Sequence, residues 1–505
     1  MRVNHTLSPL LICVLLISPA LAEVSLTVYS SADPAGFDPQ QFIAQQRRGY
    51  NPNYVQQVPG FGVVRDVRSI DLKQGTSTLS FTDVAEFIDP TTVSFTDMTA
   101  PDATSVLEQQ FLFDLVSPEK LLEKYIDQQI TVRLPMGDGP VETVTGKLLS
   151  SNQGQLVLQT GNGLRMFSRG QGQVQLGEVP GGLITKPTLQ WLINSKRPGK
   201  RTIRTAYQTA GLTWKADYNL VVNADDTAAS LGAWVTLINL SGASYPDAQL
   251  KLIAGDVQRV QNQPRPMQMA YARKAAMEAD AAGFEEKSFY EYHLYTLPRK
   301  TTIAQNTTQQ IALFPTVDDV KIEKVLAYDG QPQSQYWNWG NPQTNKALGN
   351  DSNKKVEVYL RFENKENNHL GIPMPRGKVR VYKQDPADKT LEFVGEDLID
   401  HTPKNQTVMI KTGNAFDVTG QRTQTDFTID NRAHRMTESF KIELSNAKDQ
   451  PVKVVIVERL YRWTNWEITR ETDDHKKIDA RTMHYEMTVP AEGKKTVEYT
   501  VLYTW

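Results

Sequence analysis

The most reactive group of side chains in this sequence is an acidic cluster formed by Glu396, Asp397, Asp400 and His401. Carboxylates beside a histidine can bind a hard cation, and two carboxylates can share acid–base work, so Asp397 and Asp400 could serve a hydrolase. The alternative is a polar strand edge that leads into a turn at Pro403. We favour the strand edge, because no second cluster of His or Asp lies at a ligand-like spacing.

A further candidate ligand is His293, which lies among Tyr290, Tyr292 and Tyr295. This alternation is typical of a strand, and it favours a packed or surface histidine over a metal ligand. The chain contains no HExxH, GxSxG or CxxC motif and no phosphate-binding P-loop. The sequence therefore predicts a protein without catalytic residues, cofactors or a metal site.

The segment 179–216 contains many basic residues and no acid. Its candidate ligand contacts are Lys196, Arg197, Lys200 and Arg201. Such a segment could contact anionic envelope polymers or phosphorylated lipid headgroups. It could equally be a solvated connector and strand face whose charges pair with acids elsewhere, and we favour this second interpretation.

Aromatic side chains in a polar loop are the remaining candidates for ligand contact. Tyr336, Trp337 and Trp339 have Asn, Gln and Gly as neighbours, and Trp463 and Trp466 lie near the C-terminus. Exposed aromatic faces could stack on sugars, which would make the protein a carbohydrate-binding or envelope-polymer-binding module. More often such residues fix a loop to a core, where their large apolar area is buried.

The N-terminus has the order of a secretory signal peptide. Arg2 precedes an apolar run at 10–17, followed by Pro19 and by small residues that end at Ala22. The apolar run is far shorter than the roughly 20 residues that cross a bilayer. We therefore predict cleavage after Ala22, a mature chain without a transmembrane segment, and a periplasmic or extracellular location.

Composition narrows the class of protein further. Cys13 is the one cysteine of the 505 residues and lies inside the predicted leader, so the mature chain would have no disulfide and must be stabilised by a large core. The apolar fraction of 39% and the charged fraction of 22% are ordinary for globular domains. A net charge of −2 gives no argument for a nucleic-acid partner.

After the predicted leader, residues 23–116 are predicted to form a small β domain. Apolar and polar residues alternate at 24–29, which is the period of a strand with one buried face. The runs 70–72 and 79–81 lie on either side of Gly75 and predict a hairpin.

Residues 117–182 are predicted to form a helix followed by a small β-barrel. Ser117, Pro118 and Glu119 suit the N-cap and first turn of a helix. Five short strand-like runs follow, separated mostly by Gly-containing turns, and this pattern resembles a small Sm-like or SH3-like barrel. Acidic and basic residues are balanced in this segment, which argues against an RNA-binding surface.

The rest of the chain predicts tandem, immunoglobulin-like β-sandwiches. We expect a first sandwich at 183–329 with a helical or disordered insert at 261–288, a loop at 330–353 and a second sandwich at 354–505. Alternating strands end three times at an asparagine, with a polar stretch after each. These corner residues are Asn239, Asn364 and Asn446.

Six segments in the C-terminal two-thirds resemble a bacterial family called domain of unknown function 4139. They include YQTAGLTWKADY at 207–218 and GIPMPRGKVRVY at 371–382, and the others lie at 194–200, 290–297, 394–403 and 415–420. The resemblance covers about residues 190–505. It implies a bacterial envelope or secreted protein with no assigned reaction, and it supplies no catalytic residues.

These observations together predict an exported, non-enzymatic protein that binds or scaffolds in the cell envelope. Its partner would be an envelope protein or a polysaccharide. The carbohydrate-binding module and a hydrolase that uses Asp397 and Asp400 remain the alternatives, and the sequence leaves the oligomeric state open.

Overall fold

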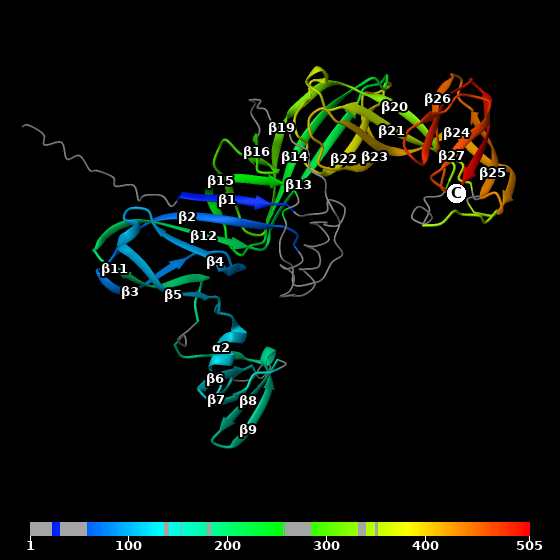
Figure 1. Cartoon of the computed structure of the whole chain (residues 1–505). Coiled ribbons are helices and arrows are strands. Elements are labelled where there is room, and N and C mark those ends of the chain that lie inside the picture. Colours follow the sequence, from blue (N-terminus) through cyan, green and yellow to red (C-terminus); the bar gives the residue numbers. More distant parts are fainter. Residues whose placement is uncertain are drawn as a thin grey trace, which may run out of the picture.

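The computed structural model describes residues 23–30, 58–135, 141–152, 154–178, 183–255, 257, 284–331, 340–348 and 352–505. These residues are mainly β-strands arranged around several cores, so the predicted fold class is confirmed (Figure 1). The leader with its cleavage site Ala22, most of the 261–288 insert, and Tyr336, Trp337 and Trp339 lie outside the described residues. No helix in the described part of the chain is long and apolar enough to cross a bilayer.

The first sheet belongs to a central body and gathers strands from distant parts of the sequence. Its order is β16 (Glu285–Phe289), β17 (Tyr292–Thr296), β15 (Tyr245–Ala254), β1 (Glu23–Tyr29), β2 (Phe61–Leu72), β12 (Gly199–Thr209) and β4 (Ile88–Asp97), and β18 (Thr301–Ile303) also pairs with β15. Leu26 of β1 lies opposite Leu250 in a parallel pair and opposite Val64 in an antiparallel pair. The alternating apolar residues of β1 therefore occupy the interior of a sheet.

Two further sheets complete the central body. One has the order β3 (Gly75–Thr82), β11 (Thr188–Ser195) and β5 (Thr104–Leu112). The other has the order β19 (Thr307–Lys321), β14 (Ala228–Asn239), β13 (Leu212–Val222), β22 (Gly377–Gln384) and β23 (Leu391–Ile399). A single apolar core joins all three sheets and includes the fully buried Trp191 and the nearly fully buried Trp214.

The observed strand pairing does not follow the predicted domain boundaries. Residues 23–116 form no separate domain, because β1, β2 and β4 pair with β12 and β15, while β3 and β5 pair with β11. The hairpin predicted around Gly75 is wrong, since β2 and β3 enter different sheets. Period-two alternation fixes which face of a strand is buried but not which strand lies beside it.

The C-terminal domain is a nine-stranded sheet around its own core. Its order is β27 (Trp466–Glu471), β30 (Gly493–Thr504), β25 (Arg435–Asn446), β24 (Thr407–Asp430), β21 (Lys355–Glu363), β20 (Glu323–Asp329), β26 (Val452–Arg459), β29 (Thr482–Val489) and β28 (Lys476–Lys477). β29 contacts β25 and β30, so the two halves of the sheet face each other. The predicted boundary at 354 also differs, because β20 joins this sheet and β22 and β23 join the central body.

Two long strands connect the central body to the C-terminal domain. In β21, Val356 belongs to the C-terminal core and Leu360 to the central core. In β24, Ile410 belongs to the central core and Val418 to the C-terminal core. Because β21 and β24 pair along this length, with register shifts at Lys355/Glu357 and Val358/Tyr359, strand pairing joins the two cores.

The three asparagine corners lie where the sequence predicts them. Asn239, Asn364 and Asn446 are almost completely buried at strand ends. Each side-chain amide donates to a carbonyl of the following turn, for example from Asn239 to Ala243 at 2.8 Å and from Asn446 to Gln450 at 2.9 Å. A buried amide that satisfies its own turn explains why the strand ends at that residue.

The predicted helix and barrel form an inserted domain. It contains α2 (Pro118–Lys124), β6 (Gln129–Leu134), β7 (Glu142–Ser150), β8 (Gln155–Thr160), β9 (Gly163–Ser168) and β10 (Gln173–Gln175), in the sheet order β10-β6-β7-β8-β9. The Ser117 hydroxyl caps α2 by accepting from the Lys120 amide at 3.2 Å. The sheet has its own apolar core, but β9 and β10 do not pair with each other among the described strands, so the barrel is not closed.

Short 3-10 turns accompany the strands. They are η2 (Pro101–Ala103), η3 (Arg169–Gln171) and η4 (Glu366–Asn368).

The inserted domain joins the central body through a neck of two adjacent chain segments (Figure 1). Leu115 and Ile184 form a parallel bridge. The Val116 amide donates to the Ile184 carbonyl at 2.9 Å, and the Ile184 amide donates to the Asp114 carbonyl at 3.1 Å. The two ends of the insert therefore lie side by side. The first follows β5 and the second leads into β11, and these two strands pair in the central body.

Removal of the inserted domain is expected to leave the rest of the protein folded. A variant in which a short Gly-Ser linker replaces residues 117–182 keeps every strand of the central body, and loop length changes closure entropy only slowly. We expect its unfolding free energy, measured by denaturant titration with circular dichroism, to change by about 1 kcal/mol or less. An aggregated product without a cooperative transition would show that the insert has a role in folding the body.

Candidate functional site

A cavity of about 640 Å³ lies where the neck meets the central body. Residues of β2, of the β3–β4 connection, of the neck, of β12 and of the β14–β15 turn line it. Pockets for small ligands commonly measure about 300–1,000 Å³ and often lie at junctions between domains. Its size and position make this cavity the strongest candidate site in the described part of the chain.

A partly buried ion pair forms one wall of the cavity. Arg68 Nη2 donates to Asp66 Oδ2 at 2.6 Å, and the Asp66 side chain is only 8% exposed. The Arg68 guanidinium also lies 3.8 Å from the centre of the Phe81 ring and donates to the Thr82 carbonyl at 2.9 Å. Three kinds of contact thus hold Arg68 in place, and its charge is matched by Asp66.

A second ion pair lies at the rim, between the neck and the central body. Lys186 Nζ lies 2.6 Å from Asp83 Oδ1, and both side chains are more than half exposed. An exposed pair of this kind stabilises a fold by only about 0–1 kcal/mol. Its main consequence here is that the charges of Lys186 and Asp83 offset each other.

Glu86 is the remaining charged residue of the cavity wall. Its backbone amide donates to the Ser241 carbonyl at 2.8 Å, which fixes the position of the residue. Its half-buried carboxylate makes no hydrogen bond or ion pair with any residue that the structure describes. Burial raises the pKa of Glu86, because a carboxylate loses hydration there.

Gly242 leaves the space that the Glu86 side chain occupies. Its φ of +85° is a conformation that glycine adopts without strain. A Cβ atom on Gly242 would lie 2.3 Å from the Cβ atom of Glu86 and 3.0 Å from Glu86 Oε2. A glycine at this turn is therefore a condition for the observed position of the carboxylate.

Two buried tyrosines, Tyr207 and Tyr245, belong to the same wall. The Tyr207 hydroxyl accepts from the Ala85 amide at 3.4 Å, and the Tyr245 hydroxyl lies 2.8 Å from Ser241 Oγ. Burial raises the pKa of both tyrosines, so both are neutral at ordinary pH and can donate as well as accept hydrogen bonds.

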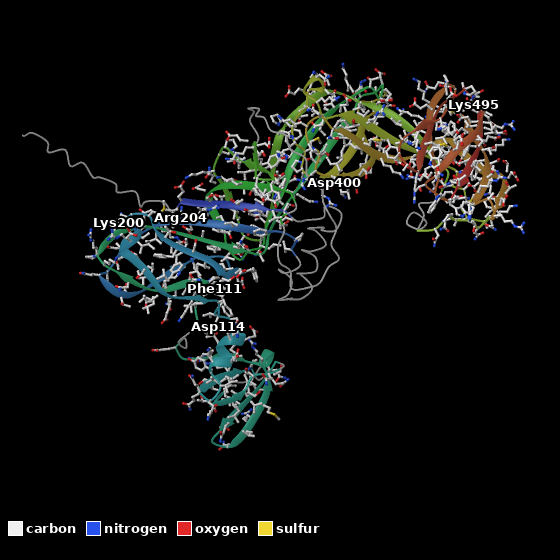
Figure 2. All side chains as sticks on the ribbon, viewed as in Figure 1. Phe111, Asp114, Lys200, Arg204, Asp400 and Lys495 are labelled. Carbon is white, nitrogen blue, oxygen red and sulfur yellow. The ribbon has the colours of Figure 1, made fainter. Side chains whose placement is uncertain are left out.

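In the structure, the acidic side chains of the predicted cluster contact backbone amides and basic side chains of the same region. Asp397 accepts the amides of Leu398 at 2.8 Å and Lys411 at 2.7 Å, and so fastens β23 to β24. Asp400 is exposed and lies 3.5 Å from Arg376 (Figure 2). These contacts are those of a polar strand edge.

The other two members of the acidic cluster, Glu396 and His401, also make contacts within the fold. Glu396 pairs with Lys378 at 2.9 Å, and His401 Nδ1 accepts the Arg376 amide at 3.1 Å. Within the described ranges, no group of three or more His, Cys, Asp or Glu side chains is arranged to hold a metal ion.

The predicted basic contacts gather at the turn between β11 and β12. Lys196, Arg197 and Lys200 are exposed there, and Figure 2 shows Lys200 and Arg204 at the outer part of β12. Arg201 differs from these three, because its Nε atom lies 3.8 Å from Asp97 and the side chain is largely buried. The tip of this hairpin is thus a basic surface separate from the cavity.

The remaining predicted candidates either make contacts within the fold or lie outside the described residues. Tyr336, Trp337 and Trp339 lie outside the described residues. Trp466 packs against the C-terminal core, and its Nε1 donates to the Ala480 carbonyl at 2.8 Å. His293 Nδ1 lies 2.6 Å from Glu286, which is a contact between neighbouring strands.

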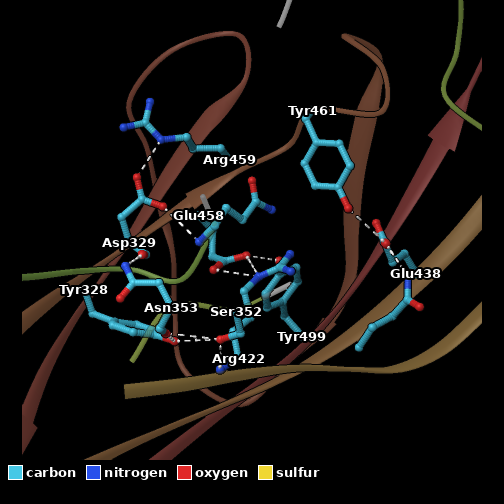
Figure 3. A network of polar contacts seen from close by, with 12 residues as sticks. Tyr328, Asp329, Ser352, Asn353, Arg422, Glu438, Glu458, Arg459, Tyr461 and Tyr499 are labelled. Atoms are coloured by element: carbon cyan, nitrogen blue, oxygen red, sulfur yellow. Dashed lines mark hydrogen bonds and ion pairs between the residues drawn. The ribbon is translucent and has the colours of Figure 1, made fainter. Parts of the chain in front are cut away.

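An ion pair in the C-terminal core has no counterpart among the predicted residues (Figure 3). Arg422 Nε donates to the two carboxylate oxygens of Glu458 at 3.1 and 2.9 Å, and both side chains are at most 2% exposed. Tyr499 also donates to Glu458, and the Arg422 guanidinium lies 3.5 Å from the centre of the Phe440 ring. Burial favours the uncharged form of Arg422, but the Glu458 carboxylate offsets this and raises the pKa of Arg422.

A second buried ion pair fixes the described part of the predicted 330–353 loop. Arg462 Nη2 donates to Glu438 at 2.8 Å, and both side chains are fully buried. Arg462 Nη1 donates to the carbonyls of Gln343 and Asn345 at 2.9 and 2.8 Å. Because both ion pairs are sealed from solvent, we assign them to the stability of the domain and not to ligand binding.

A family model described as a domain of unknown function, DUF4139, matches residues 203–505. This match confirms the resemblance found in the sequence. It includes Tyr207, Gly242 and Tyr245 of the cavity wall, whereas Asp66, Arg68 and Glu86 lie before it. A search of curated proteins finds no match to the chain.

Proposed function

Since the chain belongs to the DUF4139 family, whose description assigns no reaction, we propose that it is a non-enzymatic binding or scaffolding protein of the cell envelope. In this proposal the leader is removed after Ala22, and the mature protein acts in the periplasm or outside the cell. It presents surfaces to an envelope protein or polysaccharide and uses no cofactor.

The observation that supports binding is the cavity at the neck. Its wall combines apolar side chains with two ion pairs and two tyrosine hydroxyls, and apolar surface with a few polar groups is typical of a ligand site. Because Leu115, Thr185 and Lys186 of the neck form part of the wall, an occupant would contact both the inserted domain's attachment and the central body.

The observation that supports scaffolding is the connection between the cores. The paired strands β21 and β24 pass from the central core into the C-terminal core, which couples the two bodies through backbone hydrogen bonds. A stiff, all-β body with an appended domain is suited to hold partners at fixed positions.

Cross-linking in living cells tests the proposal. A photo-reactive amino acid at Thr185, in the cavity wall, is expected to capture an envelope protein or polymer, and the captured chain should begin at Glu23 by mass spectrometry. The same amino acid at Asp449, in an exposed turn of the C-terminal domain, is the control and is expected to capture far less. A full-length, cytoplasmic protein that yields no adduct from Thr185 would refute the proposal.

A further inference from the structure

We infer that the neck cavity binds an organic cation, namely a protonated amine on a short apolar stem, with the Glu86 carboxylate as its counter-ion. The inference deepens the proposed function, because it names the chemistry of a ligand for that site.

The balance of charges in the cavity supports a cation. Asp66 is matched by Arg68 at 2.6 Å and Asp83 by Lys186 at 2.6 Å. Glu86 has no such partner among the described residues, so the charged groups of the wall sum to one negative charge. An anionic ligand would add a second unmatched negative charge to the wall, whereas a single positive charge completes a third pair.

The position of Glu86 also favours an ionic partner. Burial removes part of the hydration of its carboxylate, and its pKa is raised because nothing in the described structure replaces that hydration. A charge-assisted hydrogen bond from an ammonium group would restore the lost interaction. Gly242 leaves room for the carboxylate at this position, because a side chain there would collide with Glu86.

The uncharged residues of the wall indicate what kind of body the cationic ligand has. Val84, Leu115 and Pro187 supply apolar surface, and Ser244 and Tyr207 supply hydroxyl groups. A cavity of about 640 Å³ exceeds the size of a bare ammonium or metal ion. The chemistry therefore fits an amine with a hydrocarbon or aromatic body, which a free small molecule or a lysine side chain of a partner could each provide.

The experiment measures binding of defined probes to the mature full-length protein by saturation-transfer NMR. Phenethylamine represents the free amine, the tripeptide Gly-Lys-Gly represents the side chain, and 2-phenylethanol is the uncharged match of phenethylamine. We expect phenethylamine, Gly-Lys-Gly or both to bind, and we expect 2-phenylethanol to bind at least about tenfold more weakly than phenethylamine if the free amine is the ligand. Whichever cationic probe binds better identifies the source of the amine.

The Glu86→Gln variant keeps the shape of the side chain and removes its charge. We expect it to weaken binding of the cationic probe about tenfold or more, whereas Glu467→Gln, on an exposed face of the C-terminal domain, should leave binding unchanged. Equal binding of the cationic probe to the Glu86→Gln variant, binding of 2-phenylethanol as tight as that of the better cationic probe, or no binding of either cationic probe would overturn the inference. A cross-linked adduct from Thr185 in cells would still support the proposed function in that case, so the two failures can be told apart.

Discussion

The Glu458→Leu variant is expected to lose about 3–5 kcal/mol of unfolding free energy in the C-terminal domain. Glu458 and Arg422 are at most 2% exposed, so the substitution leaves a guanidinium in the core without its counter-ion. The Tyr499 hydroxyl loses its acceptor at the same time. Denaturant unfolding followed by circular dichroism measures this loss as a lower midpoint of the C-terminal transition.

Two further variants show whether the buried charge is the cause. The triple variant Arg422→Met, Glu458→Leu, Tyr499→Phe removes every polar member of the contact, and we expect it to recover most of the lost stability, since a hydrophobic replacement of a buried pair is often neutral or stabilising. Glu443→Leu breaks the exposed pair with Lys494 and is expected to destabilise the domain far less than Glu458→Leu does, because solvent screens the exposed pair. Equal losses for Glu458→Leu and Glu443→Leu would contradict the burial seen in the structure.

The Trp191→Ala variant is expected to destabilise the central body by about 3–5 kcal/mol. Trp191 is fully buried on β11, where its ring contacts Phe81 and Phe95 with centroid distances of 5.9 and 5.3 Å. Its Nε1 also donates to Gln109 on β5 at 2.9 Å. Truncation therefore removes a large apolar area and opens a space between two sheets that surrounding side chains cannot fill.

The matched control is Trp234→Ala on β14. The Trp234 side chain is 41% exposed, so its removal is expected to cost about 1 kcal/mol or less. Both variants are measured by circular dichroism in denaturant, because tryptophan fluorescence changes with the substitution itself. A loss at Trp234 as large as that at Trp191 would show that the burial assigned to the two residues is wrong.

Several local features could be predicted because a short stretch of residues determines them. The cap of α2 follows from Ser117 and Pro118, whose side chains suit the first turn of a helix wherever it packs. The strand corners at Asn239 and Asn446 follow in the same way, since each amide binds the carbonyl of its own turn. These contacts span only a few residues, so no distant partner is needed to specify them.

The candidate site could not be predicted for the opposite reason. Glu86, Lys186 and Gly242 are far apart in the sequence and meet only because β2, β11, β12 and β14 assemble into one body. None of the three belongs to a sequence motif. Glu86 stands out as a candidate only once the structure shows that the other charged residues of the wall form ion pairs with each other. Alternation in β24 did contain a partial signal for the buried ion pair, because Arg422 lies on the same face as the buried Val418.

The sequence by itself determined that the chain is mainly β, where its helix and strand corners begin and end, and to which family it belongs. Tertiary structure alone decided that β1 lies inside a sheet with β15, that residues 117–182 form an insertion on a two-segment neck, and that the Glu86 carboxylate has no ion-pair partner among the described residues. The physical reason is that side-chain period and turn chemistry are local properties, whereas strand pairing and charge balance depend on which distant segments fold against each other.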